Sequence, residues 1–86
     1  MFAVADGETI YGELKHQLGQ YLNDEMTLDQ FVFWYIPATW NIHQIEHERA
    51  IDLTYAIDLR LAEHSNGNLS DGELKELLAK ELKNHA

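Results

Sequence analysis

The chain has 86 residues, of which 45% are hydrophobic, and its fifteen aspartates and glutamates outnumber six lysines and arginines to leave a net charge of −9. Cysteine is absent, which excludes disulfides and thiolate chemistry and fits a cytoplasmic protein. A surface this acidic repels phosphate backbones and anionic membranes. We therefore expect no nucleic-acid or membrane partner, and attraction to basic protein surfaces instead.

The length and the scarcity of turn residues indicate a single helical domain over residues 1–86. One proline and five glycines leave few turns, which favours helices over a many-stranded fold. Residues 1–9 turn acidic before an apolar run develops, which is unlike a signal peptide. No stretch approaches the roughly 18 apolar residues that a membrane span needs.

The first periodic segment predicts a helix over about residues 8–23. Ile10, Leu14, Leu18 and Tyr21 recur at helical spacing and form one apolar stripe. Two glycines inside the segment each weaken it by about 1 kcal/mol relative to alanine. We therefore expect this helix to depend on packing against its neighbours.

A capping box opens the second predicted helix, over about residues 28–36. Thr27 followed by Gln30 is the capping pattern, and Pro37 is expected to end the helix because the residue before a proline avoids the helical region. Valine and the aromatic residues of this segment also suit a β-strand. The cap, and the lack of a pairing strand elsewhere, favour the helix.

Five of the nine aromatic side chains lie in residues 31–40. At 100° per residue, Phe31, Trp34 and Tyr35 share one side and suit a core, whereas Phe33 points away from it. Trp40 is expected on the loop that follows. A short helix cannot bury every direction in a domain of this size, so these last two aromatics predict an exposed apolar patch, the kind that marks interfaces.

The third predicted helix runs over about residues 43–65, beginning at Ile42 or His43. It has two apolar stripes, one formed by Ala50, Leu53, Ile57 and Leu61 and the other by Ile51, Tyr55, Leu59 and Ala62. A helix with two apolar stripes packs on two sides. We therefore expect it to be the central helix of the fold.

The last predicted helix, over about residues 70–84, has the clearest signals in the chain. Ser70 and Glu73 form a capping box, and Leu69 can pack against Leu74 as a hydrophobic staple. The apolar stripe consists of Leu74, Leu77, Leu78 and Leu82. Together the four segments predict an all-α fold, a compact bundle of four helices.

His43 and His47 form the one pair with metal-like spacing. Two histidines four residues apart on a helix share a face and could hold zinc. The order H-E-x-x-H of metalloproteases is absent, because Glu46 comes directly before the second histidine. No third or fourth ligand can be named, so we expect no metal and treat metal binding through this pair as an alternative only.

Catalytic chemistry is otherwise missing from the sequence, and we expect no enzyme, no catalytic residues and no cofactor. Serine occurs only at Ser65 and Ser70, both at predicted helix ends, and no glycine-rich phosphate loop is present. Asp58 lies between the two stripes of the third helix, so it is expected to be partly buried. A structural pairing with a lysine, an arginine or a tyrosine hydroxyl is favoured over acid–base catalysis.

The layout resembles two groups of small bacterial proteins. A first helix ending at Tyr21 and Leu22, a linker of the form T-L-x-x-F at Thr27, Leu28 and Phe31, and an acidic helical remainder are similar to colicin D-type immunity proteins. This resemblance implies a helical bundle whose acidic face blocks a basic nuclease toxin. It identifies no individual toxin-contacting residue.

The second resemblance is to small uncharacterised bacterial proteins and covers most of residues 21–82. These proteins share F-x-x-W/F-x-x-P-x-x-W, present here as Phe31, Trp34, Pro37 and Trp40. They also share E-L-R-L-A-E, present as residues 58–63 with aspartate in the first position. This group implies no known activity.

The sequence therefore predicts an acidic, non-catalytic protein-interaction module, and in sharper form an immunity- or antitoxin-like inhibitor of a basic partner. The expected partner-binding residues are Glu46, Glu48, Asp52 and Glu63 on the third helix, with Phe33 or Trp40 as an aromatic anchor. Two alternatives stay open. One is a structural or regulatory homodimer that uses residues 31–40, and the other is a metal-binding protein.

Overall fold

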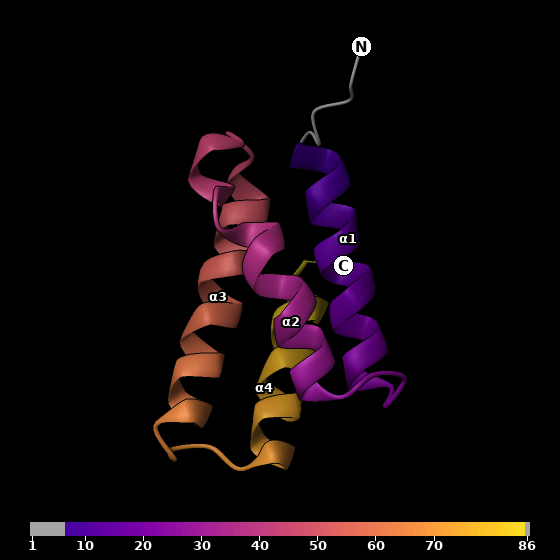
Figure 1. Ribbon diagram of the computed structural model, residues 1–86, viewed down its shortest axis with the longest axis vertical. Coiled ribbons are helices and arrows are strands. Elements are labelled where there is room, and N and C mark those ends of the chain that lie inside the picture. Colours follow the sequence, from indigo (N-terminus) through magenta and orange to yellow (C-terminus); the bar gives the residue numbers. More distant parts are fainter. Residues whose placement is uncertain (1–6, 86) are drawn as a thin grey trace.

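The computed structural model describes residues 7–85 (Figure 1). Its helices, in chain order, are α1 (Gly7–Leu22), α2 (Leu28–Thr39), the short 3-10 helix η1 (Ile42–Gln44), α3 (Glu48–Ser65) and α4 (Asp71–Asn84). Residues 7–85 contain no strand, so the all-α prediction is confirmed. The expectations about a signal peptide and about the limits of the domain concern residues 1–6 and 86, which lie outside the described residues.

The core lies where α1, α3 and α4 pack against one another, and α2 packs on α1 and closes the core from one side (Figure 1). Complete burial of a large apolar side chain stabilises a fold by about 1.5–3 kcal/mol. All four α-helices contribute large apolar side chains without exposed surface, namely Leu14, Leu18, Phe31, Leu53, Ile57, Leu74 and Leu78. The predicted compact bundle of four helices is therefore confirmed.

The prediction that Pro37 ends the second helix at Ile36 was wrong. Pro37 lies inside α2, which continues to Thr39. The proline has no N–H to donate to the carbonyl of Phe33, four residues earlier. One turn further on, the buried Thr39 hydroxyl donates to the carbonyl of Tyr35 at 2.9 Å. Burial of this last turn against the core keeps the helix intact past the proline.

The start of the third helix was also predicted wrongly, because α3 begins at Glu48 rather than near residue 43. Between η1 and α3 the backbone of Glu46 has a positive φ of 52°, which no α-helix accommodates. His47 then acts as the N-cap, and its Nδ1 accepts a hydrogen bond from the backbone N–H of Ala50 at 3.1 Å. A histidine in place of serine or aspartate hid this helix start in the sequence.

The expectation that α3 packs on two sides was wrong as well. In its first stripe Ala50, Leu53 and Ile57 are buried and Leu61 is partly buried, but Tyr55 and Leu59 of the second stripe are exposed. α1 and α4 cover the inner side of α3, whereas on its outer face Tyr55 contacts His43 of η1 and Leu59 stays exposed. A bundle of this size therefore leaves part of the apolar surface of α3 open.

The fourth helix agrees with its prediction almost to the residue. Ser70 is the N-cap of α4, and its hydroxyl accepts from the N–H of Glu73 at 3.2 Å while the Glu73 carboxylate accepts from the N–H of Ser70 at 3.0 Å. These hydrogen bonds stabilise the carboxylate form and lower the pKa of Glu73. The capping box predicted for α2, between Thr27 and Gln30, is also present.

None of the helices in residues 7–85 combines the length and the apolar character needed to cross a membrane.

Candidate functional site

Five large hydrophobic side chains remain more than half exposed. On α2 and at its C-cap these are Phe33 (84%), Ile36 (61%) and Trp40 (75%), and on α3 they are Tyr55 and Leu59 (54% each). The predicted exposure of Phe33 and Trp40 is confirmed. Exposed apolar surface gathered on neighbouring elements is typical of sites that bind another molecule.

The exposed apolar residues of α2 and its C-cap form a continuous row, which we call the α2 ridge and define as Phe33, Ile36, Pro37 and Trp40. Their spacing of i, i+3, i+4 and i+7 places all four on one side of the helix. Residues of α2 on the opposite side are buried, namely Phe31, Tyr35 and Thr39. Because Pro37 lies within the helix, the ridge continues to Trp40, which is the C-cap of α2 rather than a loop residue.

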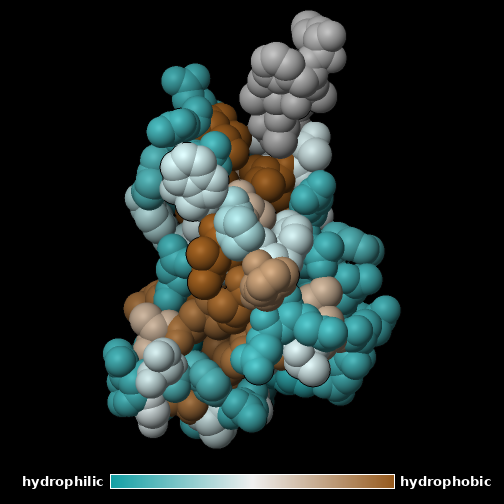
Figure 2. Space-filling model, viewed as in Figure 1, coloured by the Kyte–Doolittle hydropathy of each residue, from teal (hydrophilic) through white to brown (hydrophobic). Residues whose placement is uncertain are grey.

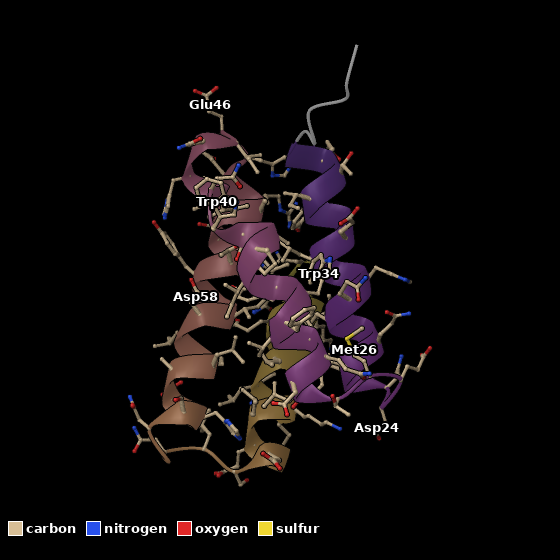
Figure 3. All side chains as sticks on the ribbon, viewed as in Figure 1. Asp24, Met26, Trp34, Trp40, Glu46 and Asp58 are labelled. Carbon is tan, nitrogen blue, oxygen red and sulfur yellow. The ribbon has the colours of Figure 1, made fainter. Side chains whose placement is uncertain are left out.

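The inner side of α2 is held by stacked aromatic rings. The ring of Phe31 lies 5.8 Å from that of Tyr21 on α1 and 5.4 Å from that of Tyr35, in stacked geometry. Trp34 lies 6.2 Å from Phe31 and is partly buried against the core, between α2 and α1 in Figure 3. These contacts fix the orientation of α2, so the α2 ridge is held outward by the packing of the opposite face.

Tyr35 also connects α2 to α3. Its hydroxyl donates to Oδ1 of Asp58 at 2.7 Å and lies 3.0 Å from the backbone carbonyl of Thr54; Asp58 is labelled on α3 in Figure 3. Burial, reinforced by the hydrogen bond to the carboxylate, raises the pKa of Tyr35. Asp58 is exposed rather than partly buried as expected, and its pairing with a tyrosine hydroxyl matches the structural interpretation.

Beside the α2 ridge lies an open groove of about 830 Å³. Figure 2 shows hydrophobic surface between α2 and α3 in the lower half of the view, bordered by hydrophilic surface. The residues that line the groove are Leu28, Asp29, Val32, Phe33, Ile36 and Pro37 from α2, with His64 and Ser65 from the end of α3. No lysine or arginine is among the described residues that line it.

A second exposed row runs along the outer face of α3. We call it the α3 row and define it as Glu48, Asp52, Tyr55, Leu59 and Glu63, of which the first four are exposed and Glu63 is half-buried. The spacing of i, i+4, i+7, i+11 and i+15 keeps these side chains on one face. Three of the acids predicted to bind a partner therefore do share a surface, and the two apolar residues interrupt them.

The predicted acids differ in their surroundings. Glu48 and Asp52 are exposed one turn apart, whereas Glu63 lies about 16 Å further along the helix and pairs with Arg60 at 2.8 Å. Glu46 is exposed in the turn before α3, at the same end of the molecule as Trp40 (Figure 3). The structure thus gathers Glu46, Glu48 and Asp52 at one end and separates Glu63 from them.

Ile36, Tyr55 and Leu59 were missed as site residues. The signal for Ile36 was its spacing three residues after Phe33, which the expected end of the helix obscured. Tyr55 and Leu59 were recognised as an apolar stripe but assigned to packing. Nothing in a single helix pattern distinguishes a stripe that meets a neighbour from one that faces solvent.

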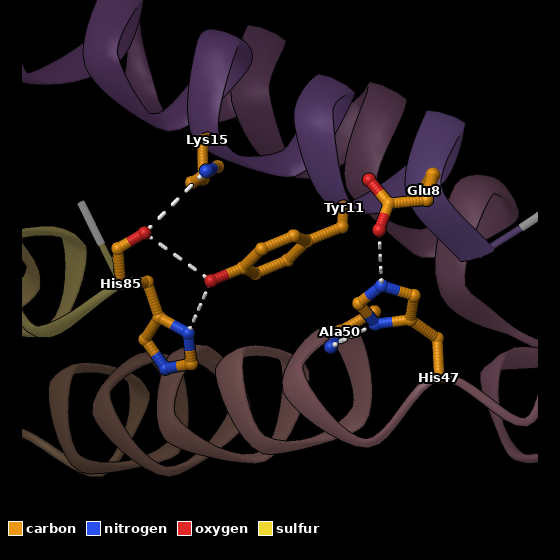
Figure 4. A network of polar contacts seen from close by, with 6 residues as sticks. All are labelled: Glu8, Tyr11, Lys15, His47, Ala50 and His85. Atoms are coloured by element: carbon orange, nitrogen blue, oxygen red, sulfur yellow. Dashed lines mark hydrogen bonds and ion pairs between the residues drawn. The ribbon is translucent and has the colours of Figure 1, made fainter.

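His43 and His47 do not share a helix face, contrary to the premise of the metal alternative. His43 lies in η1, where its Nδ1 is 3.2 Å from the hydroxyl of Tyr55. His47 faces α1 instead, with its Nε2 3.4 Å from Oε1 of Glu8 (Figure 4). Within residues 7–85 no three histidine, aspartate or glutamate side chains are arranged to hold a metal ion.

His47 has a structural role that connects α1 to α3. Because its Nδ1 accepts from the N–H of Ala50, the ring proton sits on Nε2, which donates to Glu8. The ring packs 5.2 Å from that of Tyr11. A Cβ on Gly7 would come within 2.3 Å of the Cβ of His47, so only glycine permits this approach.

Tyr11 extends this polar cluster to the end of α4 (Figure 4). Its hydroxyl lies 2.8 Å from Nδ1 of His85 and 3.2 Å from the His85 carbonyl, which also accepts from Nζ of Lys15 at 3.4 Å. Burial lowers the pKa of His85, and the positive charge of Arg49 lowers it further. The cluster therefore holds the start of α1 and the end of α4 together.

Comparison with known proteins adds no relative to this description. No protein-family model, no curated protein and no solved structure matches the chain.

Proposed function

We propose that the chain is an acidic, non-catalytic protein-interaction module that binds a basic partner protein. The observation that supports this most directly is the exposure of five large hydrophobic side chains on a chain of net charge −9. Apolar anchors supply binding free energy once they are desolvated. Surrounding acids attract a cationic surface and exclude acidic ones.

The charge distribution supports the choice of a basic partner. Residues 16–48 contain no lysine or arginine, so the α2 ridge carries no cation of its own. The α3 row begins with Glu48 and Asp52, both exposed. Such a surface accelerates encounter with a positively charged protein at low ionic strength.

In its sharper form the proposal is an immunity- or antitoxin-like inhibitor. The acidic end formed by Glu46, Glu48 and Asp52 would cover a cationic active site, with Trp40 of the α2 ridge as the apolar anchor. Inhibition would then arise from occlusion rather than chemistry. The resemblance of the layout to colicin D-type immunity proteins is consistent with this mechanism.

The experiment is a pull-down from a lysate of the native host, washed first at low salt and then at about 0.5 M salt, where charge interactions are screened within a few ångströms. We expect one basic protein at near-equal stoichiometry that high salt releases. Asp52→Lys should weaken the capture, and Glu76→Lys on the exposed side of α4 should not. Capture that is indifferent to salt and to Asp52→Lys would contradict the proposal.

A second candidate function is a structural or regulatory homodimer, favoured by the α2 ridge alone. Two copies could bury Phe33, Ile36 and Trp40 against each other. Sedimentation equilibrium at low and high micromolar concentration separates the two functions. A monomer throughout this range excludes the homodimer, whereas a dimer that Phe33→Ser converts to monomer would replace the basic-partner proposal.

A further inference from the structure

We propose that the groove beside the α2 ridge receives an amphipathic helix of the partner, apolar on one face and lined with lysine or arginine on its flanks. This inference rests on the proposed function and names the kind of segment that the module binds. It concerns the groove of about 830 Å³ between α2 and the end of α3, and not the α3 row.

The floor of the groove has the geometry of a helix-binding surface. Leu28, Val32 and Ile36 follow one another at intervals of four residues and line the groove. They span about 12 Å along the axis of α2, or two turns of an incoming helix. Phe33 and Pro37 form one wall, so a partner helix with apolar residues at i, i+4 and i+7 can insert them beside this wall.

A helix fits this groove better than an extended peptide or a small molecule. The walls are helices, whose backbone groups bond internally, so they offer no edge that an extended strand could pair with. A helical partner satisfies its own backbone. Small-molecule sites bury most of their ligand, but Phe33 and Ile36 are too exposed to enclose one.

The charges around the groove favour a basic segment. Asp29 lines it, and the opposite wall carries His64, whose Nε2 lies 2.6 Å from Oδ1 of Asp71. Among residues 7–85, no lysine or arginine lines the groove.

The same charges argue against a second copy of the chain as the occupant. Two copies would each bring a net charge of −9, and a contact between the two α2 helices would contain Asp29 from both without a cation from either helix. Such a contact lacks any ion pair and brings like charges together. A basic helix supplies the charges that the groove lacks.

The experiment uses the full chain and a synthetic helix of about 15 residues, with leucines at i, i+4, i+7 and i+11 and lysines on the flanks. A peptide of the same composition in scrambled order keeps the charge and removes the stripe. Amide chemical shifts locate the binding site, and fluorescence anisotropy of a labelled peptide measures the affinity. Ile36→Ser tests the groove, and Leu59→Ser is the matched control because both side chains are exposed.

We expect the striped peptide to shift amides around Val32 and Ile36 and to bind at least about tenfold tighter than the scrambled one. Ile36→Ser should reduce the affinity about tenfold, whereas Leu59→Ser should change it less than about twofold. Equal binding of the two peptides, or shifts confined to the α3 row, would overturn the groove proposal and leave the basic-partner function standing.

Two other results would also overturn the proposal. One is no binding of the striped peptide at millimolar concentration while the pull-down still captures a basic partner. The other is a change of the groove amides with protein concentration alone, which would identify a second copy as the occupant. Loss of partner capture in the pull-down, in contrast, would remove the proposed function itself.

Discussion

The helices on the two sides of the bundle have similar apolar stripes and caps, but the stripes are buried on one side and partly exposed on the other. On the closed side, α1 and α4 bury their apolar stripes and direct charged residues outward. On the open side, α2 buries one face and exposes the α2 ridge, while α3 exposes Tyr55 and Leu59. α2 and α4 both begin with a capping box, so a strong helix start does not indicate how completely a helix will be covered.

The largest effect that would test this comparison is expected within α2 itself. Phe31→Ala should lower the free energy of unfolding by about 3–5 kcal/mol, because Phe31 is fully buried and stacks on Tyr21 and Tyr35. Phe33→Ala, two residues away, should change it by less than about 0.5 kcal/mol. Urea unfolding followed by circular dichroism measures both. Similar losses for the two variants would show that the α2 ridge is part of the core.

On the closed side, Gly7→Ala should destabilise the fold by about 1–3 kcal/mol, because the added Cβ would meet the Cβ of His47 at 2.3 Å. Gly12→Ala on the same helix is the matched control, since no atom apart from its chain neighbours and the backbone of α1 lies within 4 Å of its Cβ position. That variant should stabilise α1 by up to about 1 kcal/mol. Thermal unfolding of both variants would detect the opposite signs, and a stabilising Gly7→Ala would contradict the close approach of α1 to His47.

The capping boxes of α2 and α4 allow the stability of the open and the closed side to be compared at equivalent helix positions. Ser70→Ala and Thr27→Ala each remove one hydroxyl acceptor and should cost about 0.5–2 kcal/mol. The loss at Thr27 should show first as fraying of α2, whose outer face lacks packing. Hydrogen exchange of the first-turn amides, compared between the variants, measures this difference. If the α2 amides exchanged only when the whole protein unfolds, α2 would unfold as cooperatively as the helices of the closed side, and this prediction would be wrong.

The smallest effect is a dependence on pH at the closed side. The pKa of His85 is lowered by burial and then by Arg49, so the folded state binds a proton less readily than the unfolded chain. Its contribution to stability is fully present above about pH 6.5, the unfolded value, and is lost as the pH falls through the lowered pKa. The stability difference between pH 7.5 and 5.5 should therefore be larger in the native chain than in His85→Gln. Equal differences would show that His85 does not take part.

Much of the fold could be predicted because local chemistry specifies it. Helix periodicity identified the buried stripes of α1 and α4, and two capping boxes located the starts of α2 and α4 to within a residue. The start of α3 could not be located, because its cap is the ring nitrogen of His47 held in place by α1. That contact joins residues 39 positions apart, and no local pattern encodes it.

Part of the candidate site could be predicted from the sequence, and the rest depended on contacts between helices. The exposure of Phe33 and Trp40 could be predicted, because a short helix that is apolar on every side cannot bury all of its side chains in a small domain. Ile36 was not predicted as a site residue, because Pro37 was expected to end the helix. The buried Thr39 keeps α2 helical beyond the proline, and this tertiary contact extends the α2 ridge to Trp40.

The sequence by itself determined the helical class, the buried stripes, the two capping boxes and the acidic charge, because these depend on residue type and on spacing along one helix. Only the tertiary structure decided which apolar stripes stay open, where α3 begins, and that a groove lies between α2 and α3. These features depend on which helix lies beside which, and four helices of this length cannot cover every apolar face that their sequences contain.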